Sequence, residues 1–525
     1  MKKLTKYSLL LMSFLFIACS GDDNNIPDPG PDPDPKPDPE IPVEPPHECL
    51  VGSLFGFDKS VRTADIKDTE NTTFYNLSLF TPPNTEDEWW DNLVEEFAYS
   101  GMDYAMANCR GILPDPKKYT DHGDPTRLPS LIEAMERRGV ADKFKVAIFD
   151  DCPASWAAAR NLDLYDKYAS LIESGKYDYP LDNLDGEGGV YKYIWDYNLK
   201  IAFQKVPDKY LLKYDGRPVI FFWSVNNFLN PAGQDNYSGK LSVILKRIRA
   251  DFKKEFGADP FLVVDRSFYD RDRTVYYPVV DGINDWFTMN QPYSARTHND
   301  LTVGVAVPGF STNDKQGNKM FLDADHGKLL DKALSSLIKQ KSQIILIEGF
   351  TDVRENAALW RSTDTKFYDY PNQRINMVRR YTKNAYPANL KVEAEGCDYY
   401  KDNTAGNSGN LFRKGDLDVK KCTDTYGGWC VTHTSDGEWL QWKELPFRAK
   451  ASTFKLRYAS AAAAKVCFNV GGKDCAEIQL PSTNNEWKTV DAGTVTFDAK
   501  GEYDVTLKIV SGNIDINYFN IVAAE

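Results

Sequence analysis

The sequence has few of the residues that build a structural zinc site. It contains five histidines, and its nine cysteines form no Cys-x-x-Cys pair and no cluster with histidine at zinc-ligand spacing. Small zinc-stabilised modules depend on such closely spaced cysteine and histidine ligands. The composition therefore argues against a structural zinc site.

Basic residues are also in the minority. Lysine and arginine number 63 against 76 aspartates and glutamates, which gives a net charge of −13, and no basic stripe interrupts this balance. The charge argues against nucleic-acid partners and against electrostatic binding to anionic membranes. A glycine-rich phosphate turn after an early strand is missing too, since Gly186–Gly189 follows no predicted strand, and this disfavours an open doubly wound sheet.

The bulk composition is that of a globular protein, with 42% apolar and 26% charged residues. A chain of 525 residues is too long for one ordinary core, so two or more domains are expected. The aromatic fraction of 13% suits carbohydrate sites, where ring faces stack on sugars, and suits large cores equally well.

The first 18 residues have the pattern of an export signal. Three lysines precede Ser8–Ala18, an apolar run too short to cross a bilayer as a helix. The run ends directly before Cys19, which resembles a bacterial lipobox whose cysteine becomes the lipidated N-terminus. Ser20–Asp23 is similar to the acidic signal that sends some lipoproteins to the cell surface. These resemblances imply an outer-membrane lipoprotein exposed at the cell surface.

Residues 19–46 are expected to be the lipidated cysteine and a linker. Repeated Asp-Pro in Ile26–Pro46 favours an extended, semi-rigid spacer that cannot pack into a core. Eight cysteines follow Cys19, and an exported protein can oxidise them. Five of them lie in the last third of the chain, and their pairing cannot be read from the sequence.

Residues 47–387 alternate short apolar runs with amphipathic segments, which predicts a (β/α)8 TIM-like barrel of the α/β class. Eight strands are expected, at Leu50–Phe57, Asp103–Cys109, Lys145–Asp150, Pro218–Trp223, Phe261–Asp265, Val280–Phe287, Val303–Val307 and Gln343–Ile347. Helices are expected between them, for example at Glu86–Tyr99, Arg127–Arg138, Pro153–Ser174, Gly239–Phe256, Gly327–Lys341 and Pro371–Tyr381.

Polar and aromatic residues gather at the predicted strand ends, which converge on one face of a barrel. Carboxylates, amides and arginine pair with sugar hydroxyls, and indoles stack on sugar rings. The predicted substrate-binding residues are Asp150, Asp151, Trp223, Asn226, Asp265, Arg266, Asp281 and Trp286. Each could instead form a rim salt bridge or a helix cap, and Asp150 and Asp151 are good cap candidates. The long polar loop Gly309–Gly327 could be a substrate lid or a calcium loop, although it lacks EF-hand spacing.

The stretch Gln343–Ser362 combines a buried strand with a charged loop. Its apolar run leads into Glu348, Asp352, Arg354 and Glu355. A last barrel strand that opens into carboxylates is a typical way to present catalytic groups. The alternative is a solvated loop in which the carboxylates pair with Arg354.

Residues 388–525 change to short alternating strands without an amphipathic helix, which predicts an all-β antiparallel sandwich of jelly-roll type. The motifs Val392–Glu395, Asp436–Leu440, Phe454–Ala459, Glu486–Val490 and Asn513–Phe519 resemble a family 6 or family 35 carbohydrate-binding module. An alternative is a structural sandwich that only packs on the barrel.

That resemblance implies two sites in the sandwich. Glu393, Glu395 and Asn517 would frame a structural calcium ion between the first and last strands. The ligand cleft would contain His433, Trp487 and Asp515, with His433 where an aromatic platform is usual and Asp515 where asparagine is usual.

The segment Gly349–Asn356 resembles the last-strand motif of family 99-like and family 71-like glycoside hydrolases, Ser-Phe/Trp-Asn-Glu-Trp-x-Glu-Gly. Asp352 falls on the first glutamate of that motif and Glu355 on the second. The resemblance implies that Glu355 is the general acid and base and that Asp352 assists the 2-hydroxyl of the sugar; Glu348 is a further catalytic candidate. Nearly the whole mature chain resembles the domain of unknown function family 5010, which pairs such a barrel with such a module.

The sequence thus predicts a surface-anchored glycoside hydrolase that acts on a polysaccharide or host glycan. The expected partners are a glycan, the outer membrane and other glycan-uptake proteins. No cofactor is expected for catalysis, and calcium is expected only in the C-terminal domain. The alternative is a catalytically inactive glycan-binding lipoprotein.

Overall fold

The computed structural model describes residues 49–63, 66, 73–81, 85–112, 121, 123–151, 174, 184–185, 190–225, 237, 239–313, 317 and 319–524. The signal sequence, Cys19, the linker, Asn226 and nearly all of the predicted helix Pro153–Ser174 lie outside these residues. Within the described part, no helix combines the length and the apolar character needed to span a membrane.

The N-terminal part is built on parallel strands. In chain order they are β1 (Leu50–Phe55), β2 (Tyr104–Cys109), β3 (Lys145–Asp151), β5 (Arg217–Trp223), β6 (Phe261–Asp265), β7 (Gly282–Asn284), β9 (Leu301–Ala306) and β12 (Ile344–Ile347). Each overlaps one predicted strand. The sheet runs from β7 through β6, β5, β3 and β2 to β1, and then through β12 and β9 to β8.

The sheet curls almost onto itself. Its end strand β8 (Tyr293–His298) pairs antiparallel with β9, and β4 (Lys213–Tyr214) pairs antiparallel with β5. The other end strand, β7, lies beside β8 and β9 without a described hydrogen-bonded ladder between them. The result is a nearly closed, mostly parallel barrel-like sheet of mixed α/β class. The sixth strand is shorter than predicted, because the chain leaves the sheet after Asn284.

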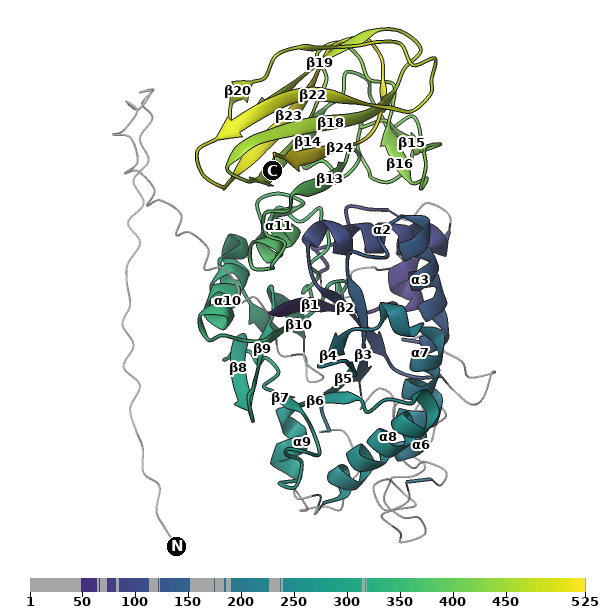
Figure 1. The fold of residues 1–525 in the computed structure, drawn as a ribbon, viewed down its shortest axis with the longest axis vertical. Coiled ribbons are helices and arrows are strands. Elements are labelled where there is room, and N and C mark those ends of the chain that lie inside the picture. Colours follow the sequence, from purple (N-terminus) through teal and green to yellow (C-terminus); the bar gives the residue numbers. More distant parts are fainter. Residues whose placement is uncertain are drawn as a thin grey trace, which may run out of the picture. The chain divides into compact units, whose positions relative to one another are not determined.

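Helices stand outside the ring of strands (Figure 1). The α-helices are α1 (Lys59–Arg62), α2 (Glu86–Ser100), α3 (Leu128–Arg137), α6 (Val190–Ile194), α7 (Lys200–Lys205), α8 (Lys240–Phe256), α9 (Arg266–Arg271), α10 (Lys328–Lys339) and α11 (Gln373–Arg380). Short 3-10 or π turns occupy Pro125–Arg127, Trp195–Leu199, Asp208–Tyr210 and Asp325–Gly327. Helix α2 begins where Thr85 Oγ1 accepts a hydrogen bond from Glu88 N, and it ends at Gly101 in the left-handed conformation.

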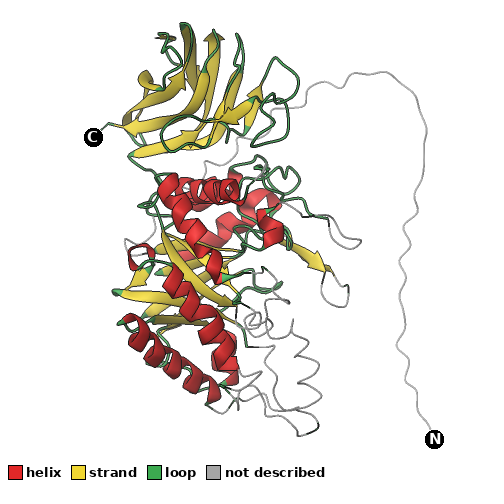
Figure 2. Cartoon of the chain, turned by 90° about the vertical axis from the view of Figure 1, so that its right-hand side faces the viewer, coloured by secondary structure: helices red, strands yellow, loops and turns green. Residues whose placement is uncertain are grey.

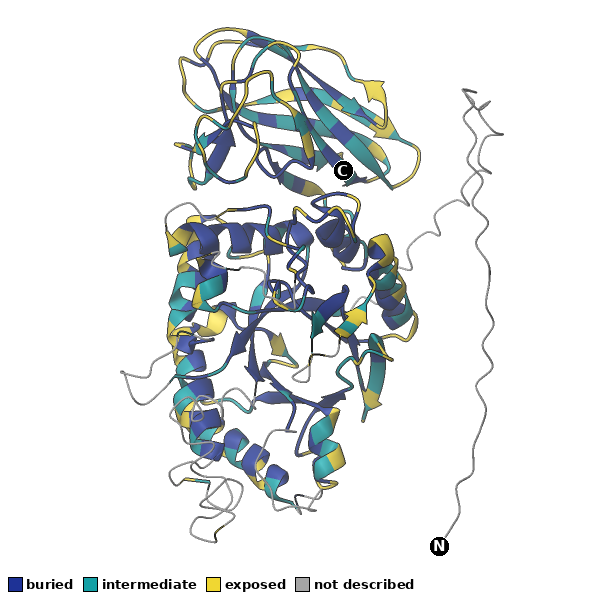
Figure 3. Ribbon diagram, turned by 180° about the vertical axis from the view of Figure 1, so that it is seen from behind, coloured by how far each residue is buried: buried dark blue, intermediate teal, exposed yellow. Residues whose placement is uncertain are grey.

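Alternate side chains of the strands form the interior of the ring. One buried cluster takes every second residue from seven strands: Leu54, Tyr104, Met106, Ala147, Phe149, Val219, Phe221, Phe261, Val263, Leu301, Val303, Val305, Ile344 and Leu346. The intervening strand residues pack in a second cluster with the helices. Burial on both faces explains why the strands are continuous apolar runs, and Figure 3 shows them as the most buried elements of this part.

The C-terminal part is an antiparallel β-sandwich without described helices (Figure 2). One sheet orders β15 (Val419–Lys421), β16 (Trp429–Val431), β24 (Asp515–Ala523), β18 (Lys450–Ala459) and β22 (Lys488–Phe497), with β13 (Asn389–Glu393) on β24. The other orders β14 (Tyr399–Lys401), β17 (Trp439–Phe447), β23 (Gly501–Ser511), β19 (Ala464–Val470) and β20 (Lys473–Asp474), with β21 (Ile478–Leu480) on β19. The predicted sandwich is confirmed.

The polar loop Gly309–Gly327 contains a hairpin rather than a simple loop. Strands β10 (Phe310–Asn313) and β11 (Lys319–Leu322) pair antiparallel. Phe310, Met320 and Leu322 belong to a small apolar cluster with Val307. The hairpin follows β9 and therefore lies at the carboxyl end of the sheet.

Asp281 lies at the amino end of β7, opposite the expected rim. Its carboxylate accepts hydrogen bonds from Arg217 (2.6 Å) at the start of β5, from Arg249 of α8 and from Leu262 N (2.8 Å). The predicted placement of Asp281 among substrate-binding residues is wrong, because this carboxylate joins strands and a helix at the far end of the ring.

Replacing Asp281 by alanine should therefore lower stability without acting on the carboxyl rim. Two arginines would lose their shared carboxylate, and we expect the free energy of unfolding to fall by about 2–4 kcal/mol. This loss is smaller than for most fully buried ion pairs, because Arg217 is partly exposed. Urea denaturation measures this change. Asp270→Ala, which breaks an exposed pair with Arg266, is the control and should cost less than about 0.5 kcal/mol. Unchanged stability of the Asp281 variant would contradict the assignment.

Candidate active site

The loop after β12 begins with a sharp reversal at Gly349, whose φ is 82°. A Cβ at this position would lie 2.5 Å from the carbonyl oxygen of Ala357, so the close approach of the two segments requires glycine. Leu359 N donates to Gly349 O (3.0 Å), and Ala357 N donates to Asp352 O (2.9 Å). The segment is thus a compact loop fixed at the carboxyl end of the strand.

The base of the loop is tied to β1 and α2. Phe350 N donates to Leu54 O (2.6 Å), and the Phe350 ring stacks on Phe97 of α2 with centroids 3.9 Å apart. Thr351 Oγ1 donates to Gly56 O (2.7 Å). These contacts leave little freedom for the backbone that carries Asp352.

The β10–β11 hairpin braces the other end of the loop. Ser311 N donates to Glu355 O (2.7 Å), and Asn356 Nδ2 donates to Ser311 O (3.0 Å). Asn356 has a φ of 51° and also accepts from Tyr75 N (3.0 Å) through Oδ1. Asparagine tolerates this left-handed conformation better than most residues, so it fixes the backbone next to Glu355.

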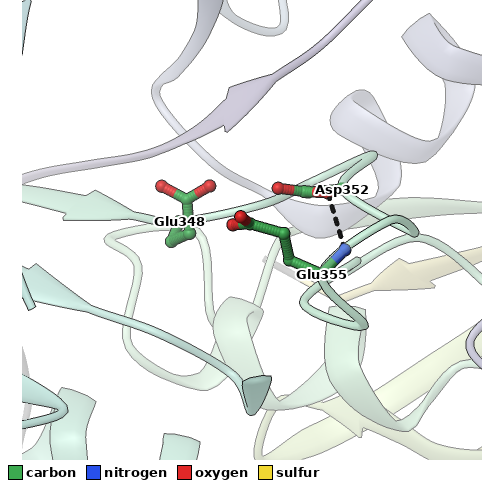
Figure 4. A group of neighbouring side chains, drawn as sticks. All are labelled: Glu348, Asp352 and Glu355. Carbon is green, nitrogen blue, oxygen red and sulfur yellow. Dashed lines mark hydrogen bonds between the residues drawn. The ribbon is translucent and has the colours of Figure 1, made fainter. Parts of the chain in front are cut away.

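Three carboxyl groups converge above this loop. Glu348, Asp352 and Glu355 each place an oxygen within 4.8 Å of the other two. In Figure 4 the Glu355 side chain points toward Glu348, and Asp352 lies beside both. Asp352 Oδ1 accepts a hydrogen bond from Glu355 N (3.1 Å). The structure therefore brings together all three residues that the sequence singled out as catalytic candidates.

Burial raises the pKa of each of these carboxyl groups. The pKa of Glu348, whose exposed fraction is 6%, lies well above its usual value because of burial first and the charges of Asp352 and Glu355 second. Burial followed by the charge of Asp352 also raises the pKa of Glu355 strongly. Burial raises the pKa of Asp352 as well, but hydrogen bonds from Glu355 and the charge of Arg110 oppose this rise. Asp352 is therefore the group of this pair that ionises first.

Glu355 and Asp352 act on each other directly: after burial, the charge of Asp352 is the largest cause that raises the pKa of Glu355. Three carboxylates this close to one another repel, which favours the protonated form of at least one of them. Three oxygens at this spacing could also surround a cation. The different pKa shifts of Glu355 and Asp352 also suit an acid beside a base.

Arg110 was not among the predicted site residues, although it follows directly after β2. Its Nε donates to Asp151 Oδ2 (3.1 Å), and its Nη1 lies 3.6 Å from Asp58 Oδ2. Its charge acts on all three carboxyl groups of the cluster. The position at a strand end was the only signal in the sequence that could have identified it.

Four predicted substrate-binding residues lie at the mouth of the ring, where the carboxyl ends of the strands meet. Three of them point inward by the alternation of side chains along their strands, and the fourth packs against inward-facing rings. Asp151, Trp223 and Asp265 are two residues beyond the interior residues Phe149, Phe221 and Val263, as Glu348 is beyond Leu346. Trp286 packs on Phe149 (centroids 5.6 Å apart) and on Trp223 (6.2 Å). The mouth of the ring is thus lined by carboxylates and two indoles.

Other predicted members lie elsewhere. Asp150 is fully buried and, by strand alternation, faces away from the interior that Asp151 faces. Arg266 is exposed on α9 and donates to Asp270 (2.8 Å). The prediction that these two side chains line the mouth is wrong. Arg354 is exposed and donates to Ser60 Oγ (2.7 Å), so it does not form the expected alternative pair with the cluster. Asn226 lies outside the described residues.

The three predicted cleft residues of the sandwich lie at one end of its first sheet. Asp515 of β24 lies opposite Ala459 of β18, and Lys488 of β22 lies opposite the preceding residue, Tyr458. Trp487, next to Lys488, therefore lies on the other side of Ala459 from Asp515. Trp487 Nε1 donates to Thr423 Oγ1 (3.0 Å). Asp515 accepts from Lys420 and Thr432 (both 2.6 Å), and the exposed His433 hydrogen-bonds Ser408 Oγ (2.8 Å).

The predicted calcium ligands come from the first and last strands of the sandwich. Glu393 lies opposite Tyr518 in the ladder, and Ala394 N donates to Asn517 O (2.9 Å). Glu393 Oε2 and Glu395 Oε2 are buried and accept no hydrogen bond from the described residues, whereas Glu393 Oε1 binds Lys391 (2.5 Å). Two buried oxygens without donors fit the preference of calcium for hard oxygen ligands.

Comparison with known protein families identifies both parts of the chain. The sequence model described as "Domain of unknown function (DUF5010)" matches residues 47–399. The chain belongs to the DUF5010 family. A second model, "Carbohydrate binding module (family 35)", matches residues 413–521. Both families were expected from the sequence, and the module supports glycan binding by this DUF5010 protein.

No curated protein matches the chain. Among solved structures, the C-terminal CBM6 of LamC, a laminarinase from Zobellia galactanivorans, is 26% identical and aligns 26% of this chain with 98% of its own, with a TM-score of 0.21. CsCBM6-3 from Clostridium stercorarium in complex with cellobiose is 17% identical over 26% of this chain and 95% of its own, with a TM-score of 0.21. The GH26-CBM35 β-(1,4)-mannanase from Podospora anserina is 14% identical over 26% of this chain and 28% of its own, with a TM-score of 0.20.

Glu348→Gln should stabilise the protein at neutral and alkaline pH but not in acid. The pKa of Glu348 is higher in the folded chain than in the unfolded chain, where it is about 4.3. The Glu348 carboxyl therefore contributes its full stability to the fold below this unfolded pKa, and that stability is lost as pH rises through the folded pKa. Glutamine keeps the neutral shape at every pH. Melting temperatures at pH 4 and pH 8 measure the difference, with Glu486→Gln, whose side chain is 77% exposed, as the control. Equal effects at both pH values would contradict the buried, protonated state.

Proposed function

We propose that the protein is a glycoside hydrolase, anchored to the outer membrane through a lipid on Cys19 and exposed at the cell surface, that acts on a polysaccharide or host glycan. The observation that carries the catalytic part is the cluster of Glu348, Asp352 and Glu355 at the mouth of the ring, in which Asp352 Oδ1 accepts a hydrogen bond from Glu355 N (3.1 Å). The carbohydrate-binding module supports a glycan substrate. Anchoring rests on the lipobox-like sequence before Cys19 and the Asp-Pro spacer.

Glu355 is the acid in this proposal. Its raised pKa favours the protonated carboxyl, which can protonate the glycosidic oxygen of the departing sugar. After cleavage the same carboxylate takes a proton from the incoming water. Asp352, which ionises first, takes the proton of the sugar's 2-hydroxyl, whose oxygen bonds to the anomeric carbon as the glycosidic bond breaks. Water then displaces this oxygen from the anomeric carbon, and Asp352 returns the proton to it.

Glu348 supports this pair from the end of the strand. Its carboxyl is the most buried of the three, and in its neutral form it adds no negative charge beside Asp352. The close spacing leaves little room for a water between acid and base, because inverting enzymes hold their carboxyl groups about 6.5–9.5 Å apart. We therefore expect retention of anomeric configuration.

The walls of the mouth suit a sugar. Trp223 and Trp286 offer indole faces for stacking, and Asp151 and Asp265 offer acceptors for hydroxyl groups. The parallel strand order and the converging strand ends support a (β/α)8 barrel as the scaffold, since such barrels place their reactive groups at the carboxyl ends of the strands.

In the sandwich, His433, Trp487 and Asp515 are proposed to bind glycan, and Glu393, Glu395 and Asn517 to hold calcium. The two sites have separate duties. The first keeps the enzyme near its substrate, and the second ties the first strand of the sandwich to the last.

Glu355→Gln should lower kcat about 10²–10⁴-fold, the usual contribution of a positioned acid, and Asp352→Asn should also impair turnover. Activity of the native protein should fall as pH rises through the raised pKa of Glu355, and the Gln variant should lose this alkaline limb. The purified chain is assayed against a broad glycan panel, with product anomers followed by NMR. Arg354→Gln, on the same loop but bonded to Ser60, is the matched control and should keep full activity.

Two results would contradict the catalytic proposal. Unchanged hydrolysis by both carboxyl variants would remove Glu355 and Asp352 from the mechanism. Oligosaccharide binding by the native chain without any product after long incubation would instead support the catalytically inactive glycan-binding lipoprotein.

Chelation of calcium should destabilise the sandwich. EGTA is expected to lower the melting temperature of the native chain, because binding to the folded state alone adds stability. EGTA saturated with calcium is the control for the chelator itself. Glu395→Gln, which keeps the shape but removes a charged ligand, should abolish the response. An identical melting temperature with and without EGTA would rule out this site.

A further inference from the structure

Two pairs of cysteines in the sandwich have the same separation in sequence. Cys422 and Cys430 flank the turn between β15 and β16, and Cys467 and Cys475 flank the turn between β19 and β20. All four are present as thiols. Equal spacing suggests equal chemistry, but the registers of the two hairpins differ.

The register of β15 and β16 places Cys422 and Cys430 on one face. Lys420 lies opposite Cys430, and Cys422 N donates to Gly428 O (2.8 Å), which continues the same register. Cys422 is two residues from Lys420, and side chains two apart on a strand share a face. The two thiols also act on each other: Cys430 lowers the pKa of the Cys422 thiol, and Cys422 raises the pKa of the Cys430 thiol.

The register of β19 and β20 separates the other pair. Asn469 lies opposite Asp474, and Cys475 N donates to Phe468 O (2.7 Å), so Cys475 pairs with Phe468. Cys467 is one residue from Phe468 and therefore leaves the sheet on the opposite face from Cys475. A bridge between these two would require the hairpin to slip by one residue.

We propose that Cys422 and Cys430 form a disulfide and that Cys467 and Cys475 do not bond to each other. Oxidation proceeds by exchange with a low-molecular-weight disulfide such as oxidised glutathione. The Cys422 thiolate attacks one sulfur of that disulfide and releases the first glutathione thiol. The deprotonated Cys430 then attacks the Cys422 sulfur of the mixed disulfide and releases the second. The two protons and two electrons of the protein thiols end on two molecules of glutathione.

The bond would close the loop that holds Trp487. Thr423 Oγ1 accepts from Trp487 Nε1, and Asp424 accepts from Arg457 Nε (2.7 Å) and Asn517 Nδ2 (2.9 Å). Both acceptors lie inside the segment that the disulfide encloses. The oxidised loop therefore keeps the indole in place, which matters for glycan binding only if the proposed function is correct.

Peptide mapping of the full chain after incubation with oxidised glutathione tests the bond. Trypsin releases residues 422–443 as one peptide, because Lys421 and Lys443 precede the two cuts. We expect this peptide to be lighter by two hydrogens and resistant to alkylation until it is reduced. Cys467 and Cys475 fall in different tryptic peptides, separated at Lys473, and should both be alkylated without a link between them.

Stability and indole exposure provide independent measurements. Reduction should lower the melting temperature of the sandwich in the native chain by about 5 °C or more. It should not change the melting temperature of the double variant Cys422→Ser/Cys430→Ser, which has no such bond to lose. Cys467→Ser/Cys475→Ser is the matched control and should respond to reduction as the native chain does. Reduction should also increase quenching of tryptophan fluorescence by acrylamide, and this increase should be absent from Trp487→Phe.

Alkylation of both Cys422 and Cys430 after oxidation would overturn the proposal, as would a link from Cys467 to Cys475 or from either member of the first pair to another cysteine. None of these results depends on hydrolysis. If the bond forms and the chain binds no glycan in either redox state, the proposed function of the module fails while the disulfide stands.

Discussion

The structure depends on one geometric constraint, the alternation of side chains along a strand that is buried on both faces. In a nearly closed ring, every second residue must point inward, and the interior below the mouth is filled by Val, Ile, Leu, Phe, Met, Tyr and Ala. Where each strand reaches the carboxyl end, the same alternation still applies but the interior opens. Asp151, Asp265 and Glu348 are inward-facing for this reason, and Asp150 is not.

Much of the scaffold could be predicted because its strands are buried on both sides. Such strands are continuous apolar runs, and all eight overlap their predicted positions. The ends were harder, since a run of apolar residues does not reveal where the ladder stops. The predicted sixth strand Val280–Phe287 keeps only Gly282–Asn284. The antiparallel strand β8 and the β10–β11 hairpin were missed, because partly exposed strands such as Tyr293–His298 lack a long apolar run.

The candidate site shows the same limit. The sequence identified Glu348, Asp352 and Glu355 because they follow an unmistakable strand. It could not separate Asp281 from these carboxylates, because composition does not tell the amino end of a strand from its carboxyl end until the strand's limits are known. Arg110 was missed for a related reason: its role depends on Asp58, Asp151 and Asp352, which are distant in sequence and meet only through the fold.

The loop that follows β12 has a consequence for how this architecture can diversify. All three carboxyl groups of the cluster come from one short segment, residues 348–355, whereas the aromatic and polar walls come from β3, β5, β6 and the chain after β7. Chemistry and recognition are therefore encoded in separate parts of the chain. Changes in the loops around the mouth can alter which molecule fits without disturbing the spacing of the reactive groups. Conversely, one substitution near Gly349 would displace every reactive group together.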